Sequence, residues 1–297
     1  MRSALKQQFI RLGRQLADYD AWELAAKLTL LTLLLSPVGN SYIRPFILGL
    51  SVTGLLIPGM WRSPSLWTAL ALFTGIRFYI AWPLSDNHAY LLSYWCLAFA
   101  VSAWLGNREV LFSNARYLVA LIFGFAALQK WISPDYLNGV FFLITFFQDA
   151  RFEEFVVLFS SVTFEQIDIA REYLEGDYRS TPAPDSLPFV IPGSMWWLAI
   201  LSTAWNLFEQ TLIAVAFLVP KDSRLGRIRD PLLLLFCFTI YAVVPVVSFG
   251  WLILAMGIVQ SDEKSATLRY WYMGAFFALI FFYEVPWAEI LNTAISA

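Results

Sequence analysis

Six polar residues lie within or beside long apolar stretches of this 297-residue chain, four with titratable side chains that can transfer a proton and two, an arginine and an asparagine, that can form hydrogen bonds: Arg77, Asp86, Asn87, His88, Lys130 and Glu209. A carboxylate, an imidazole and an ammonium in one partly dry pocket would suit proton transfer, because burial lowers the pKa of a lysine toward the range in which its amine accepts a proton. In a membrane enzyme, which is one interpretation of these residues, Lys130 would act as the base and His88, the chain's single histidine, would tune or relay the proton. Asp86 would tune or relay the proton, and Arg77 would hold an anionic oxygen.

Each of these residues also has a structural interpretation. His88 could cap a helix or form a hydrogen bond at the level of the lipid headgroups. Lys130 precedes Trp131, and at a membrane interface lysines extend toward water while tryptophans act as anchors. Arg77 and Glu209 could form a buried structural pair, since ionisable groups inside membrane spans usually face a partner or a cavity.

Composition assigns the chain to the integral membrane proteins. Apolar residues make up 59% of it and charged residues only 14%, too few to cover a water-soluble globule of this size. The net charge of −2 gives no basic surface for a nucleic acid. The basic first residues are followed by an apolar stretch without a signal-peptide cleavage site, so we expect no removed segment. Cys96 and Cys237 lie in apolar stretches without metal-ligand spacing, which favours packing roles and no metal site.

The length of the apolar stretches predicts an all-α, polytopic transmembrane bundle of about eight spans. A spanning helix needs roughly 17–25 mostly apolar residues, because each residue rises only about 1.5 Å. The candidate spans are residues 22–38, 44–60, 66–83, 89–105, 116–131, 195–219, 231–259 and 270–285. The seventh carries Pro245 and Gly250 near its middle, which predicts a strong tilt or a break.

Lysine and arginine residues predict the orientation, because they are enriched in cytoplasmic loops. They collect before the first span and in the loop KDSRLGRIRD, and an even number of spans places both regions, and both termini, in the cytoplasm. Arg62, Arg108 and Arg116 then also lie inside, whereas His88 and Lys130 lie at the outer ends of their spans. The acidic segment 132–194, whose apolar pieces are too short to span, lies outside and belongs to the single domain 1–297. The string FEQIDIAREYLEG within it predicts an amphipathic helix.

Several strings occur in an order and spacing that resemble a known membrane family. DNHAYLLSYW, FGFAALQKWISPDYLNGVFF, WNLFEQTLIAVAFLVPKDSRLGRI and VPVVSFGWLILA together resemble the membrane domain shared by the vitamin K-dependent gamma-carboxylases and the bacterial HTTM (horizontally transferred transmembrane) proteins. The resemblance implies a multi-pass protein of the inner (plasma) membrane, with a reduced quinone similar to vitamin K hydroquinone as cofactor or substrate. It also implies that Lys130 deprotonates the quinol, with His88 and Asn87 lining the pocket.

The chain departs from the carboxylases in three respects. AWLGNREV stands where they have a second Asn-His element, LLLFCFTIY lacks their helix-seven histidine, and the large extracytoplasmic domain is missing. Carboxylation of a protein substrate is therefore not expected.

Two classes of function remain open. One is a membrane enzyme acting on a quinol or another lipid-soluble substrate in an outer-leaflet Lys/His pocket. The other is a non-catalytic membrane helper in the maturation or export of a small secreted peptide. A transporter is a weaker third possibility, because the chain shows no duplicated half.

Overall fold

The fold is built entirely from helices within the residues that the structure describes. A computed structural model of the protein describes residues 20–81, 87–175, 190–244, 246–261 and 266–284. These ranges contain α- and 3-10 helices and no strand, which confirms the predicted all-α class.

The described residues group into two compact units. Unit 1 comprises those within residues 1–122, 214–241 and 246–297, and unit 2 those within 123–213 and 242–245. Two long helices, α6 (Arg108–Trp131) and α11 (Gly193–Leu218), contribute residues to both units. The single domain expected from the sequence stays a prediction.

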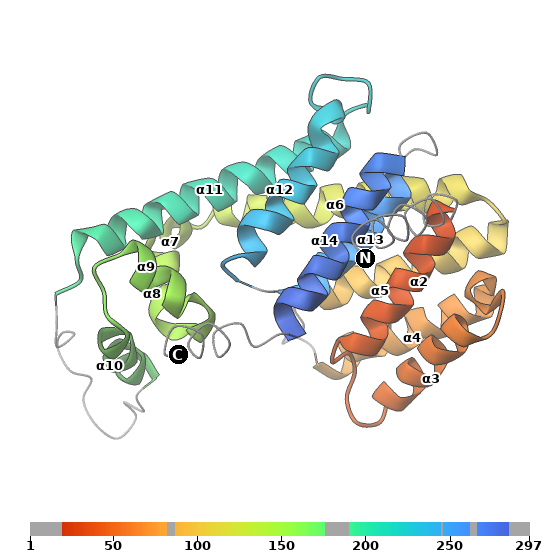
Figure 1. Ribbon diagram of the computed structural model, residues 1–297, viewed down its shortest axis with the longest axis horizontal. Helices are drawn as coiled ribbons and strands as arrows, with labels where there is room; N and C mark the ends of the chain where they lie inside the picture. The colour runs from red at the N-terminus through yellow and green to blue at the C-terminus, as the bar shows by residue number, and fades with distance from the viewer. Residues whose placement is uncertain (1–19, 82–86, 176–189, 245, 262–265, 285–297) are drawn as a thin grey trace, which may run out of the picture. The chain divides into compact units, whose positions relative to one another are not determined.

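Unit 1 contains described helices from three stretches of the chain, residues 1–122, 214–241 and 246–297, and Figure 1 labels its α-helices. In addition to parts of α6 and α11 they are α2 (Ala21–Leu35), α3 (Arg44–Leu56), η1 (Met60–Arg62), α4 (Pro64–Ala81), α5 (Asn87–Leu105), η3 (Gly226–Ile228), α12 (Arg229–Tyr241), α13 (Val247–Gln260) and α14 (Ala266–Glu284). Within the described residues, each of the eight apolar segments identified in the sequence is mostly helical. The seventh is broken rather than tilted, because α12 ends at Tyr241 and α13 begins only at Val247. The interruption was expected from Pro245, a residue type that cannot donate a helical hydrogen bond, although Pro245 itself lies outside the described residues.

The core of unit 1 surrounds α13, which packs against α2, α14 and α12. Every residue of α13 except Ser248 is buried. A helix that is apolar on all sides is typical of a central position among other helices. Helices α4 and α5 lie side by side in the same unit (Figure 1). Cys96 and Cys237 are both buried and not bonded to each other, in agreement with the packing roles predicted for them.

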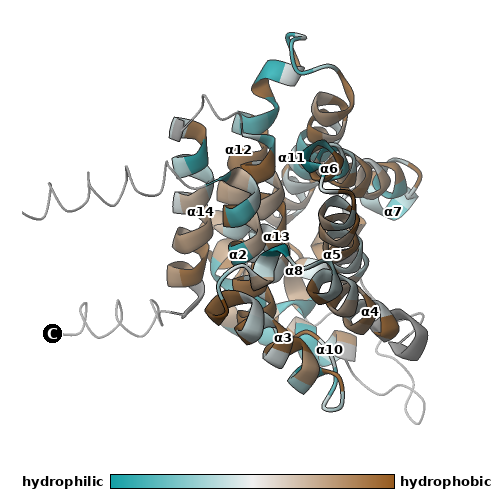
Figure 2. Cartoon of the chain, turned by 90° about the vertical axis from the view of Figure 1, so that its right-hand side faces the viewer, coloured by the Kyte–Doolittle hydropathy of each residue, from teal (hydrophilic) through white to brown (hydrophobic). Residues whose placement is uncertain are grey.

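In the part of the chain that the structure describes, two helices are long and apolar enough to cross a membrane, judged by length and composition. They are α6 and α11, and only 33% and 39% of their most apolar windows are buried. Shorter apolar helices, of 10–17 residues, lie in α3, α4, α5, α13 and α14 among the described residues. Hydrophobic residues run along helices of unit 1, α3 and α4 among them (Figure 2), and some of their side chains are exposed, such as Phe46 at 58% and Leu72 at 68%. Exposed apolar helix surface of this kind needs either a partner or lipid to cover it.

A buried polar network joins the ends of α12, α13 and α14 in unit 1. Arg229, only 1% exposed, donates to Oε1 of Gln260 at 3.0 Å, and Nε2 of Gln260 donates to the carbonyl oxygen of Phe112 at 2.5 Å. The hydroxyl of Tyr272 donates to Oδ1 of Asp230 at 2.8 Å. Because buried polar groups are costly unless hydrogen-bonded, these partners account for charged residues within an apolar core.

Unit 2 contains the segment that the sequence analysis assigned to the outer face. Its short helices are α7 (Pro134–Leu137), α8 (Val140–Gln148), η2 (Ala150–Phe152), α9 (Glu153–Phe159) and α10 (Phe164–Glu175). The amphipathic helix predicted from FEQIDIAREYLEG is confirmed as α10. Phenylalanines of α8 and its neighbours, such as Phe142, Phe146 and Phe152, pack ring against ring and form an aromatic core. The sequence also predicts a proline-rich connector after α10, STPAPDSLPFVIPG, and most of it lies outside the described residues.

The turn between α8 and α9 predicts a pH-dependent contribution to the stability of unit 2. The Arg151 side chain donates to both carboxylate oxygens of Asp149 and holds the pKa of that carboxyl below its ordinary value of 3.8. This stabilisation is therefore complete above the ordinary pKa and is lost as the pH falls through the lowered one. We expect wild type to unfold at a higher temperature than Asp149→Asn at pH 7, and the difference to shrink below about pH 3.8, measured by circular dichroism. A difference independent of pH would contradict this assignment.

Candidate functional site

Lys130 lies in the last turn of α6 and is hydrogen-bonded to α11. Its Nζ donates to Oε1 of Gln210 at 2.5 Å. Gln210 is buried at 8% exposure, and Lys130 itself is half-buried. Next to it, Nε1 of Trp131 donates to Oγ1 of Thr211 at 3.2 Å. The lysine amine is thus held by a neighbouring helix, although it sits at the end of its own helix.

Tyr136 forms the second side of this site. Its position is set by α7, which begins after Ser133, whose side chain accepts a hydrogen bond from the Tyr136 backbone N–H. The ring centroid lies 5.5 Å from Nζ of Lys130, within the range of a cation–π contact. The hydroxyl donates to Oδ1 of Asn206 at 2.9 Å. Burial raises the pKa of Tyr136, so the phenol keeps its proton and remains a donor at neutral pH.

The two amides that accept hydrogen bonds from Lys130 and Tyr136 share one face of α11 with a buried threonine. Thr203, Asn206 and Gln210 are spaced i, i+3, i+7, and side chains with this spacing lie along one side of a helix. We call these three residues the α11 polar face. Oγ1 of Thr203 is buried and has no hydrogen-bond partner within the described part of the chain. The α11 polar face therefore offers two amides and one available hydroxyl in an otherwise apolar helix.

Glu209 is also buried in α11, at 2% exposure, beside the α11 polar face in sequence. The other residues expected at the site belong to unit 1 or lie outside the described ranges. Arg77 is in α4, and Asn87 and His88 are the first two residues of α5, but their side chains lie outside what the structure describes, and so does Asp86. The shared Lys130–His88 pocket and the Arg77–Glu209 pair therefore stay predictions.

Three residues that contact Lys130 or its neighbours were not identified as candidates from the sequence: Tyr136, Asn206 and Gln210. A signal for two of them existed, because an i, i+4 pair of amides in the apolar stretch WNLFEQTL is costly without partners. The signal for Tyr136 was weaker, since a single tyrosine after a proline is common in loops.

The chemistry available here is hydrogen bonding and proton transfer. An amine, a phenol, two amides and a hydroxyl can orient a substrate hydroxyl or carbonyl and exchange a proton with it. Across the described ranges, no group of three or more His, Cys, Asp or Glu side chains is arranged to hold a metal ion.

Comparison with known proteins yields no relative. No family model matches the chain, and neither a curated protein nor a solved structure is similar to it. The resemblance to the carboxylase and HTTM membrane domains therefore stays a prediction.

Removal of the Gln210 amide should destabilise the site measurably. Gln210→Leu leaves the amine of Lys130 without its acceptor, and a buried group that loses its partner costs about 1–3 kcal/mol. We expect the free energy of unfolding in detergent to fall by that amount. The control is Gln148→Leu at the exposed end of α8, which should change it by less than about 0.5 kcal/mol. Equal effects of the two substitutions would show that the Lys130–Gln210 contact contributes nothing.

Proposed function

We propose that the protein is an integral membrane protein of about eight spanning helices, located in a bacterial inner membrane with both termini in the cytoplasm. Two long apolar helices and five shorter ones support a membrane location. So do apolar side chains that are left largely exposed, such as Leu56 at 75%, Trp104 at 68% and Phe238 at 76%. Such side chains are at low free energy when lipid covers them.

Cysteine labelling tests the orientation. The native cysteines are buried, so single cysteines can be introduced at exposed positions, Glu165→Cys in α10 and Asp222→Cys in the basic loop. A membrane-impermeant maleimide added to intact spheroplasts should label the first and not the second. Labelling of both, or the reverse pattern, would contradict the proposed orientation.

We further propose that the protein is a membrane enzyme acting on a quinol or a similar apolar substrate with a weakly acidic hydroxyl, as its resemblance to the carboxylase and HTTM membrane domains suggests. The observation that carries the proposal is the Lys130 amine, held by Gln210 among the hydrogen-bonding groups of the α11 polar face. A lysine that served only as an interfacial anchor would extend away from neighbouring helices.

The proposed chemical step is transfer of one proton. The substrate O–H bond breaks as an N–H bond forms on the neutral amine of Lys130, which leaves an oxyanion. The residues present fit a phenolic substrate, because the Thr203 hydroxyl lacks a described partner and the Tyr136 ring lies beside Nζ. In this proposal His88 and Asp86 carry the proton onward, Arg77 holds the oxyanion, and Asn87 and Glu209 support the pocket.

The proposal is tested with purified protein in lipid nanodiscs. Oxidation of a reduced isoprenoid quinone by dissolved oxygen, which the proposed deprotonation would accelerate, is followed by its ultraviolet absorbance and should be faster in discs with protein than in empty discs. Equal rates in discs with protein and in empty discs, both under air and with added carbon dioxide, would overturn the enzymatic proposal. The helper function in maturation or export of a secreted peptide would then be the remaining class.

A further inference from the structure

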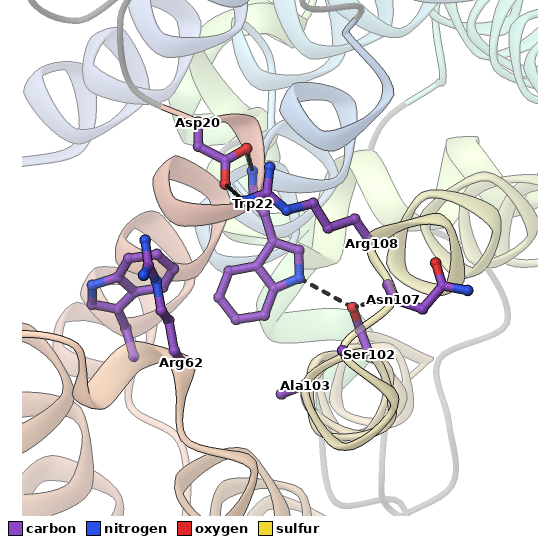
Figure 3. Close-up of a pocket in the computed structure, with 9 residues that line it drawn as sticks. Asp20, Trp22, Arg62, Ser102, Ala103, Asn107 and Arg108 are labelled. Carbon is purple, nitrogen blue, oxygen red and sulfur yellow. Dashed lines mark hydrogen bonds and ion pairs between the residues drawn. The ribbon is translucent and has the colours of Figure 1, made fainter.

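A small pocket in unit 1 lies at one end of α2 and α5 and has no lining residue in common with the Lys130 site. It has a volume of about 180 Å³, and its lining includes Asp20, Trp22, Trp61, Arg62, Ser102 and Arg108 (Figure 3). Nε1 of Trp22 donates to Oγ of Ser102 at 3.1 Å, which fixes one indole wall. The lining residues come from α2 and the residue before it, from η1, from the end of α5 and the two residues after it, and from the first residue of α6.

Two guanidinium groups border this pocket, and they are held differently. Arg108 forms an ion pair with Asp20, Nη2 to Oδ2 at 2.9 Å, and Asp20 also caps the start of α2. Arg62 lies over the ring of Trp61, with Cζ 4.5 Å from its centroid. Within the described residues the Arg62 side chain has no hydrogen bond or ion pair, so its N–H groups can bind a ligand. The pocket is thus bordered by two positive charges, Arg62 and Arg108, and one negative charge, Asp20, and this net positive charge favours binding of an anion.

We propose that this pocket binds the phosphate of an anionic glycerophospholipid. Arginine binds phosphate well because its planar fork matches two phosphate oxygens. The volume of about 180 Å³ is below the roughly 300–1,000 Å³ of pockets for drug-sized ligands, so it suits a phosphate with a glycerol unit and not a nucleotide. Trp22 and Trp61 are the residue type that collects at headgroup level.

Apolar side chains beside the pocket favour a lipid over free phosphate. Trp104 and Leu105 are 68% and 65% exposed and directly follow the lining residue Ala103. Leu56 and Ile57, just before η1, are 75% and 52% exposed. A headgroup in the pocket would allow its acyl chains to cover these surfaces. The inference depends on the proposed membrane location but not on the chemistry proposed for Lys130.

Lipid binding is measured by native mass spectrometry and thermal unfolding in detergent, with phosphatidylglycerol and phosphatidylcholine as probes. Wild type should retain phosphatidylglycerol preferentially and unfold at a higher temperature in its presence. Arg62→Gln should weaken phosphatidylglycerol binding about tenfold, through the loss of one charge-assisted contact. Arg224→Gln, an exposed arginine of the basic loop outside the pocket, is the matched control and should bind as wild type does.

Two further variants separate charge from geometry. Arg62→Lys keeps the charge without the fork and should bind more weakly than wild type but more tightly than Arg62→Gln. Arg108→Gln should also weaken binding, and it provides an independent result if Arg62→Gln does not fold. Unchanged binding by both glutamine variants, or no preference of wild type for phosphatidylglycerol, would overturn the proposal.

Inorganic phosphate distinguishes the source of the ligand. At millimolar concentration it should raise the unfolding temperature far less than phosphatidylglycerol does. Equal protection by inorganic phosphate would overturn the lipid assignment in favour of a soluble phosphate compound. Because none of these readouts measures turnover, a failure here is distinguishable from a failure of the proposed enzyme activity.

Discussion

Lys130→Met should lower quinol turnover by at least about 100-fold, the lower bound of what general acid–base catalysis typically contributes. Methionine fills the space of the aliphatic part of the lysine but cannot accept a proton. It also removes the amine that donates to Oε1 of Gln210. Turnover is measured in nanodiscs, with variant and wild-type protein matched by helical content and by elution volume in gel filtration.

The matched control for this substitution is Lys27→Met in α2. Nζ of Lys27 pairs with Glu23 one turn earlier at 2.7 Å, and the lysine side chain is 34% exposed. Such i, i+4 pairs contribute only about 0.3–0.5 kcal/mol, so this variant should fold and turn over substrate at nearly the wild-type rate. Wild-type turnover by Lys130→Met would exclude Lys130 as the base. An equal loss of turnover in both variants would point to general disruption of the fold instead.

Gly257→Ala should reduce the free energy of unfolding by about 1–3 kcal/mol, the usual cost of adding a methyl group to a filled core. A Cβ at this position of α13 would lie 2.3 Å from Cε1 and 2.5 Å from Cζ of Tyr272. Tyr272 cannot easily move aside, because it is fully buried and its hydroxyl donates to Asp230 at 2.8 Å. The strain must therefore spread into the α13–α14 packing or break that hydrogen bond. Thermal unfolding in detergent, followed by circular dichroism, measures the effect.

Gly274→Ala in α14 is the control with the opposite expected sign. No atom lies within 4 Å of a Cβ built there, and the position is exposed. Alanine is the better helix former by up to about 1 kcal/mol, so this variant should be slightly more stable than wild type. Similar destabilisation by both substitutions would show that the effect of Gly257→Ala does not come from close packing against Tyr272.

The helices were largely predictable because their signal is local. Each apolar stretch long enough to span a membrane is helical, and Pro245 marked the interruption of the seventh. The largest difference between the end of a predicted span and the end of its helix is at the start of α6, which begins at Arg108 and not at residue 116. Its first turns carry polar residues, so hydrophobicity alone placed the beginning too late. A helix end is set by capping and packing as well as by composition.

The candidate site was predictable only in part. Lys130 could be singled out because an ammonium at the end of an apolar stretch is costly without a partner. Its partner could not be identified, since Gln210 lies 80 positions later in the chain. Four further predicted residues, Arg77, Asp86, Asn87 and His88, remain untested because their side chains lie outside what the structure describes.

The sequence by itself therefore determined the helical class, the position of nearly every apolar helix and the break near Pro245. These properties follow from the solvation of consecutive side chains and from the missing N–H of proline, which act within a few residues. Only the tertiary structure decided that Gln210 accepts from Lys130, that Asn206 accepts from Tyr136, and that Gly257 lies against Tyr272. Those contacts join residues distant in the chain, and their existence depends on how whole helices pack against one another.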